Sequence, residues 1–355
     1  MNRTTDLNKD LLKAHQLHMA GRLQSAQDLY GKILSIEPDN ADALHLNGLI
    51  AFQLRHFEKA EELIQKAIWQ KPDFPNFYQS IGTVYKHQGK LDKALASYKR
   101  SYALCPENPD ILYEIGNIHY QKGALKEAEE WMKTVILKDN SHVNALLRLS
   151  TIQSEKGDYK NSNNTLERLL KINPRMALAH NNMGLNHKAM GNFDRAVLSF
   201  EKALVVEPDM FQAICNISNV YQVLSRYDLA LKYLEKALET NPGNAQVHYN
   251  MGIVFDCMGK SLEAINCYDK ALHFNPGLIS AYNNKGIVLQ NLGKISDAKN
   301  CFKAAVDLEP SNAAAWHNLG ILHGYAENYK DAVFCVERAL EADPKLSKAW
   351  VFYWD

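Results

Sequence analysis

Five asparagines stand 34 residues apart in the second half of the chain, and their type and spacing point to a binding chemistry. They are Asn182, Asn216, Asn250, Asn284 and Asn318. An asparagine side chain offers one carbonyl acceptor and two N–H donors, so it pairs with the N–H and C=O groups of a peptide backbone at once. A regular row of such amides predicts a surface that binds polypeptides in a sequence-tolerant way.

The spacing of the row matches an extended ligand if the five residues lie on helices packed side by side. Neighbouring packed helices stand about 10 Å apart. An extended peptide advances about 3.3–3.6 Å per residue, so every third peptide group would meet one asparagine. Two other interpretations stay open: inheritance by internal duplication without use, and hydrogen bonding between adjacent helices for stability. The hydrophobic neighbours Ile253, Ile287 and Ile321 fit each of these interpretations.

The histidines do not predict a metal site. His180 and His187 lie seven residues apart and share one face of a helix, but both are expected at packing positions. His119 and His323 occupy the same relative position as His187 and are expected to be core residues. A metal site needs several such ligands converging on one point. We therefore predict no metal site.

The six cysteines are predicted to be packing residues. Cys267, Cys301 and Cys335 stand 34 residues apart, and the chain has no C-x-x-C pair. Residues about 10 Å apart on neighbouring helices exceed the roughly 7 Å Cα separation that a disulfide spans. The sequence also lacks the glycine-rich, nucleophile-elbow and zinc-protease motifs of common enzymes. We predict no catalytic residue and no cofactor.

Composition limits the partners and the location. Lys plus Arg number 40 and Asp plus Glu number 40, so the formal net charge is zero, which argues against nucleic acid as the main partner. No stretch approaches the roughly 18 to 20 apolar residues of a membrane span. The first residues, MNRTTDLNKDLLKAHQ, do not resemble a signal peptide. We expect a cytoplasmic protein.

The prolines reveal the elements that position the asparagines. Nine of the eleven prolines fall at intervals of 34 or 68 residues, at 38, 72, 106, 174, 208, 242, 276, 310 and 344. Asn140 stands where the missing member would fall. A fixed period of this length is the signature of stacked helix pairs. The repeats then start at residues 7, 41, 75, 109, 143, 177, 211, 245, 279 and 313.

Other positions of the repeat agree with a helical hairpin. Position 8 is glycine in seven repeats, and position 20 is alanine in all except the fifth, which has Ser162. These small residues are expected to let the two helices approach closely. Position 15 is glycine in seven repeats, where it ends the first helix in the left-handed conformation. Arg55, Ser225 and Glu327 replace it in the other three. Proline at position 32 ends the second helix.

This pattern resembles the tetratricopeptide repeat (TPR) family over residues 7–346, and residues 282–310, YNNKGIVLQNLGKISDAKNCFKAAVDLEP, look like a near-consensus example. The resemblance implies an all-α fold: an α-solenoid, in the form of a right-handed superhelix of about ten TPR helix-turn-helix hairpins. Its concave face would be lined by the first helices. The asparagine row resembles the array in the TPR superhelix of protein O-linked N-acetylglucosamine (O-GlcNAc) transferases, which holds substrate polypeptides by their backbone. No segment resembles the glycosyltransferase domain of that family.

We therefore predict a non-catalytic scaffold that binds proteins or extended peptides in the concave groove of a TPR superhelix. The alternative is the substrate-recruiting arm of an O-GlcNAc transferase-like system whose catalytic domain is absent from this chain. Residues 347–355, SKAWVFYWD, are expected to form a partial capping helix rich in aromatic residues. Self-association through this aromatic end is a third prediction.

Overall fold

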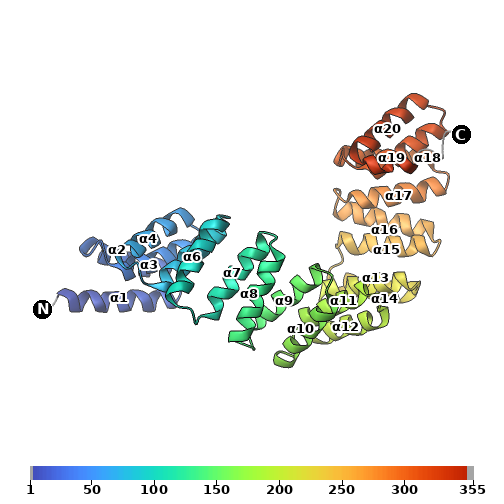
Figure 1. Cartoon of the computed structure of the whole chain (residues 1–355). Helices are drawn as coiled ribbons and strands as arrows, with labels where there is room; N and C mark the ends of the chain where they lie inside the picture. The colour runs from blue at the N-terminus through green and yellow to red at the C-terminus, as the bar shows by residue number, and fades with distance from the viewer. Residues whose placement is uncertain (1–2, 350–355) are drawn as a thin grey trace. The chain divides into compact units, whose positions relative to one another are not determined.

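The computed structural model describes residues 3–349, and this part of the chain contains twenty α-helices, one 3-10 helix and no strand. The α-helices form ten consecutive antiparallel pairs, each of which is a helical hairpin (Figure 1). We call the first helix of each pair the A helix and the second the B helix. This all-α arrangement of stacked hairpins is an α-solenoid, which confirms the predicted fold class.

The helix bounds follow the 34-residue period. The A helices are α1 (Arg3–Met19), α3 (Ala41–Gln53), α5 (Pro75–His87), α7 (Pro109–Gln121), α9 (Val143–Glu155), α11 (Ala177–Ala189), α13 (Phe211–Val223), α15 (Ala245–Cys257), α17 (Ile279–Asn291) and α19 (Ala313–Tyr325). The B helices are α2 (Leu23–Ile36), α4 (Phe57–Gln70), α6 (Leu91–Leu104), α8 (Leu125–Lys138), α10 (Tyr159–Ile172), α12 (Phe193–Val206), α14 (Tyr227–Thr240), α16 (Ser261–Phe274), α18 (Ile295–Leu308) and α20 (Tyr329–Ala342). The 3-10 helix η1 (Pro344–Ala349) follows.

The chain divides into two compact units. Unit 1 comprises residues 1–174 and therefore the first five hairpins, whereas unit 2 comprises residues 175–355 and the last five. Within each unit the B helix of one hairpin packs on the A helix of the next. A single hairpin leaves an apolar face open, and stacking against the neighbours buries it. The aromatic residues Trp350, Phe352, Tyr353 and Trp354, on which the self-association prediction rests, lie outside the described residues.

Every A helix is followed, two residues after its last residue, by a residue in the left-handed conformation. Position 15 has a positive φ in all ten hairpins, between 72° and 78° at the seven glycines. Arg55, Ser225 and Glu327 adopt the same conformation, with φ of 61°, 55° and 56°. The predicted role of glycine at this position is confirmed. The three exceptions show that the hairpin imposes this conformation even on residues with a side chain.

The B helices end at an extended residue that precedes the repeated proline. Glu309, before Pro310, has φ −136° and ψ 89°, outside the α region that a following proline disfavours. Asp139 has nearly the same angles, φ −132° and ψ 99°, although Asn140 follows it. Proline therefore favours this turn but is not required for it. In several hairpins an asparagine caps the next A helix, as where Asn312 Oδ1 accepts from the Ala315 N–H at 3.0 Å.

The small residues at positions 8 and 20 lie inside the hairpins. Alanine at position 20 is buried in all nine hairpins that have it. A Cβ atom built at Gly48 would lie 2.7 Å from Ile64, the residue at position 24 of the same hairpin. At Gly252 the corresponding distance to the Tyr268 ring is 2.5 Å. The side chain at position 24 therefore fills the space above position 8, which explains why position 8 must be small.

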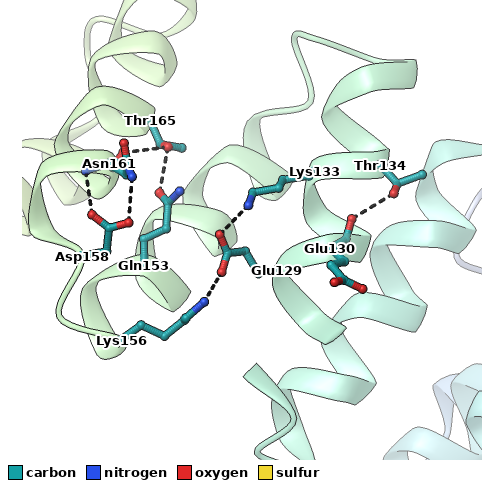
Figure 2. Close-up of polar contacts among 9 residues, drawn as sticks. All are labelled: Glu129, Glu130, Lys133, Thr134, Gln153, Lys156, Asp158, Asn161 and Thr165. Carbon is teal, nitrogen blue, oxygen red and sulfur yellow. Dashed lines mark hydrogen bonds and ion pairs between the residues drawn. The ribbon is translucent and has the colours of Figure 1, made fainter. Parts of the chain in front are cut away.

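The fifth hairpin joins its two helices through polar side chains. Ser162 Oγ donates to the Ser150 carbonyl at 2.8 Å, and both residues are buried. Thr165 Oγ1 donates to Gln153 Oε1, also at 2.8 Å, and Figure 2 shows this bond between α10 and α9. Hydrogen bonds thus replace the glycine and alanine contacts of the other hairpins at this place.

Candidate peptide-binding site

All five asparagines of the predicted row lie within unit 2. Each is the sixth residue of its A helix, on α11, α13, α15, α17 and α19 in turn. Among these helices α11 contacts α13, α15 contacts α17, and α17 contacts α19. The structure therefore places the row on successive A helices of one compact unit.

Two of the asparagines hydrogen-bond to the preceding A helix. Asn216 Nδ2 donates to Asn181 Oδ1 at 3.0 Å, and Asn284 Nδ2 donates to the Tyr249 hydroxyl at 3.1 Å. In both cases the partner is the fifth residue of the preceding A helix. These two bonds agree with the alternative interpretation, in which the amides stabilise the stack. They use one N–H group of each of the two asparagines.

Much of the hydrogen-bonding capacity of the row remains available. Asn216 and Asn284 use their amide nitrogens in these bonds and keep their carbonyl oxygens. Asn250 does the reverse, because its Oδ1 accepts from Gln246 Nε2 at 3.1 Å and its N–H donors remain. Asn182 and Asn318 have no side-chain hydrogen bond to any residue in the described part of the chain. Asn250 is the least accessible of the five, at 8% exposed.

An aliphatic row, interrupted at α13 by Asn219, runs beside the asparagines. Residues three positions apart on a helix are neighbours on its surface. Three residues beyond Asn182 stands Leu185, 40% exposed, and three beyond Asn284 stands Ile287, 39% exposed. Ile253 and Ile321 hold the same place on α15 and α19 and are half-buried. The face thus combines amides with accessible apolar side chains, which suits a peptide main chain and its side chains.

Two charged residues continue this face. Lys188 follows Leu185 by three residues on α11, and Asp256 follows Ile253 by three residues on α15. Neither forms an ion pair with another residue between positions 3 and 349. Asp256 is accessible to solvent, and partial desolvation of its carboxyl raises its pKa. Sequence reasoning did not single out this pair, because within unit 2 each charge occurs in only one repeat, and Lys86, at the same position in unit 1, pairs with Glu114.

The equivalent positions of unit 1 are chemically different. Position 6 of the repeat is occupied there by Leu12, Leu46, Ser80, Glu114 and Arg148. Glu114 accepts from Lys86 at 2.5 Å, and Arg148 Nε donates to Asn117 Oδ1 at 3.1 Å. The Arg148 guanidinium also lies over the Tyr120 ring, 4.5 Å from its centre. The amide row is therefore a property of unit 2.

Some of the histidines and cysteines are buried packing residues, and others are accessible to solvent. His323 is buried and lies 3.6 Å from Asp331, and desolvation lowers its pKa. No three His, Cys, Asp or Glu side chains come together as metal ligands within the described residues. All six cysteines are free, and Cys267, Cys301 and Cys335 are buried as predicted. Cys105 and Cys215 are half-buried, whereas Cys257 is exposed, so the prediction of a packing role is wrong for Cys257. Among the helices of residues 3–349, none has the length and apolar character needed to cross a membrane.

Models of the tetratricopeptide repeat match almost the whole chain. The models described as "Tetratricopeptide repeat" match residues 17–80, 109–140, 143–176, 177–210, 209–276, 279–312 and 313–346. A further model, described as "TPR repeat", matches residues 82–123. Together these segments cover well over half of the sequence.

Two solved structures with the same fold support this result. A tetratricopeptide repeat protein from Parabacteroides merdae is 17% identical, with a TM-score of 0.55 over 70% of this chain and 98% of its own. Yeast Tom70 is 14% identical, with a TM-score of 0.55 over 99% of this chain and 96% of its own. Both similarities concern the fold. The chain belongs to the tetratricopeptide repeat family, an architecture of stacked hairpins that is typical of non-catalytic protein-interaction scaffolds.

Proposed function

We propose that unit 2 binds polypeptide segments along the A-helix face that carries Asn182, Asn216, Asn250, Asn284 and Asn318, and that the chain acts as a non-catalytic scaffold. One observation carries this proposal: after their bonds within the protein, all five amides keep donors or acceptors, and they lie on successive A helices of one unit. Backbone pairing by these amides requires no particular partner sequence.

The aliphatic row supplies the second part of the interaction. Leu185 and Ile287 are exposed beside the amides, so a bound segment would bury apolar side chains there while its backbone pairs with the asparagines. No chemical step is needed for this function. The proposal includes a cytoplasmic location, which suits the six free cysteines because reducing compartments keep thiols free.

Recruitment of substrates to a separate protein glycosyltransferase is the second candidate. The observation that favours it is the amide row itself, which resembles the row that holds substrate polypeptides in O-GlcNAc transferases. This candidate predicts that a glycosyltransferase associates with the chain and modifies the proteins that unit 2 holds. A scaffold of the first kind holds its partners without such an enzyme.

The test compares two variants with the same number of asparagine-to-alanine changes. The first carries Asn216→Ala, Asn250→Ala and Asn284→Ala. The control carries Asn192→Ala, Asn266→Ala and Asn300→Ala, which alter exposed residues of unit 2 outside the row. Binding is measured on an array of varied peptides about 15 residues long, the length that spans five helices.

We expect the row variant to lose binding across most of the array, and the control to bind like the wild type. Circular dichroism should show the same helix content in all three proteins. Equal binding by the row variant and the wild type would exclude the amide row as the site. Mass spectrometry of proteins that the wild type captures then distinguishes the two candidates, because only the second predicts a glycosyltransferase among them.

A further inference from the structure

The period of the amide row restricts the conformation of a ligand that follows it. Neighbouring A helices stand about 10 Å apart, the distance of three extended residues. In a β-strand, however, successive residues direct their N–H and C=O groups to opposite edges, so the third residue along faces away from the first. A polyproline II segment has three residues per turn and rises about 3.1 Å per residue. The segment therefore presents the same face about every 9 Å, a period close to the spacing of the asparagines.

The backbone chemistry of such a segment also suits the amides. A polyproline II helix has no internal hydrogen bonds, so its carbonyl groups remain available as acceptors. Asn250 keeps its N–H donors for such carbonyls. Asn216 and Asn284 keep their carbonyl oxygens, which accept from the N–H of any residue other than proline. Both kinds of amide thus find partners on one face of the same segment.

Lys188 and Asp256 add a charge pattern to the face. Both are the twelfth residue of their A helix, and α11 and α15 are separated by one A helix, α13, which carries Gln222 at the same position. With a spacing of about 10 Å between successive A helices, the two charges would be about 20 Å apart. Six residues of polyproline II cover about 19 Å. Neither charge is compensated by another described residue, so each is available to a charge of opposite sign on a ligand.

We propose that unit 2 binds a polyproline II segment that has an aliphatic residue at every third position, an acidic residue opposite Lys188 and a basic residue opposite Asp256, six positions apart. The aliphatic residues contact Leu185, Ile253, Ile287 and Ile321, which stand on four of the five A helices, since Asn219 holds the place on α13. This inference rests on the proposed function of the same face. It adds the conformation of the ligand, its period and its charge pattern.

The experiment uses two synthetic peptides built from Leu-Pro-Pro triplets. Each has one glutamate and one arginine in place of prolines six positions apart, and the peptides differ only in the order of the two charges. Binding of each labelled peptide to the full chain is followed by fluorescence anisotropy at low salt. One order matches Lys188 and Asp256, and we expect it to bind about five- to tenfold more tightly than the other.

The double variant Lys188→Glu with Asp256→Lys exchanges the two charges, and it should reverse the preference between the peptides. A third peptide of the same composition, with leucines at alternating spacings of two and four residues, should bind more weakly than the matched peptide. Thermal unfolding monitored by circular dichroism checks that the charge exchange leaves the fold intact.

Three results would overturn the inference: no preference between the two charge orders, a preference that the exchange leaves unchanged, or no binding of either periodic peptide. The row variant shows whether only this inference fails or the proposed function fails as well. If Asn216→Ala, Asn250→Ala and Asn284→Ala abolish binding on the peptide array while the charge exchange has no effect, the peptide-binding face stands and only the ligand class is wrong.

Discussion

The aromatic ring of Phe302 on α18 lies against the backbone of Gly286 on α17, and the space between them is too small for a side chain. A Cβ atom built at Gly286 would lie 2.6 Å from the ring. Gly116 and Met132 stand in the same relation in the fourth hairpin, also with 2.6 Å. The separation of the two helices in these hairpins is therefore set by a glycine and the large buried side chain above it.

Replacing Gly286 with alanine should destabilise the protein by about 1–3 kcal/mol, because the added methyl group overpacks the hairpin against Phe302. The measurement is the free energy of unfolding in urea. Gly324→Ala is the matched control, since a Cβ atom there meets nothing within 4 Å. It should stabilise α19 by about 0.5–1 kcal/mol through helix propensity. Effects of the same sign at the two sites would contradict this explanation.

Glycine at position 55, 225 or 327 should stabilise the protein. Arg55, Ser225 and Glu327 hold a left-handed backbone that costs an ordinary residue about 1–2 kcal/mol. Glycine removes this strain but adds about 0.4–1 kcal/mol of unfolded-state entropy, so the net gain per site is about 0.5–1 kcal/mol. Thermal unfolding of Arg55→Gly, Ser225→Gly and Glu327→Gly checks the gain.

The reverse change provides the control for this prediction. Gly89 has φ of 73°, and a Cβ atom there would meet nothing within 4 Å, so Gly89→Ala introduces backbone strain without a steric clash. It should lower the free energy of unfolding by about 1 kcal/mol. If Gly89→Ala is neutral and Arg55→Gly gives no gain, the left-handed turn does not limit stability.

The regular parts of the fold were predictable from sequence because they depend on local chemistry. Glycine at position 15 and proline at position 32 act through their own backbone preferences, which are visible without neighbours. The contact between Gly286 and Phe302 was harder to predict from the sequence, because it depends on how two helices face each other. The predicted small residue at position 8 is explained only once the ring at position 24 is seen above it.

The candidate site was predictable as a row but not in its details. The spacing of the asparagines is visible in the sequence, whereas the bond from Asn284 to Tyr249 depends on which residue occupies position 5 of the preceding repeat. That residue is Asn181 in one repeat and Tyr249 in another, so no single motif describes the link. The charges of Lys188 and Asp256 have no period, and they stand out only once the A helices are placed side by side.

The polar interior of the fifth hairpin should be sensitive to loss of one partner. Thr165 Oγ1 donates to Gln153 Oε1 (Figure 2), and both residues are 6% exposed. Thr165→Val leaves the Gln153 carbonyl without this donor, which should cost about 1–3 kcal/mol. Gln153→Leu combined with Thr165→Val removes both polar groups and should recover most of the loss. Urea unfolding of the single and double variants measures this coupling, and additive losses would show that the bond is unimportant.

His45 should make the stability of the protein depend on pH. Its ring lies 4.6 Å from the Phe77 ring, measured between centres, and its Nε2 is 2.8 Å from Ser80 Oγ. Desolvation lowers the pKa of His45 to about 4, an effect that the nearby Asp42 partly opposes. The unfolded chain has the ordinary histidine pKa of about 6.5, so it binds more protons than the folded protein between these two values.

The contribution of neutral His45 is therefore fully present above pH 6.5 and is lost as the pH falls toward 4. Linkage gives a loss of about 2 kcal/mol between pH 7 and pH 5. His45→Gln cannot be protonated, so it should show a correspondingly smaller loss over the same interval. Four other histidines also have lowered pKa values: His18, His119, His317 and His323. They are present in both proteins, so their contributions to the pH dependence cancel in the comparison. Urea unfolding at pH 5, 6 and 7 gives the free energy of unfolding of the wild type and of His45→Gln. If it changes with pH by the same amount in both proteins, His45 is protonated in the folded state without loss of stability.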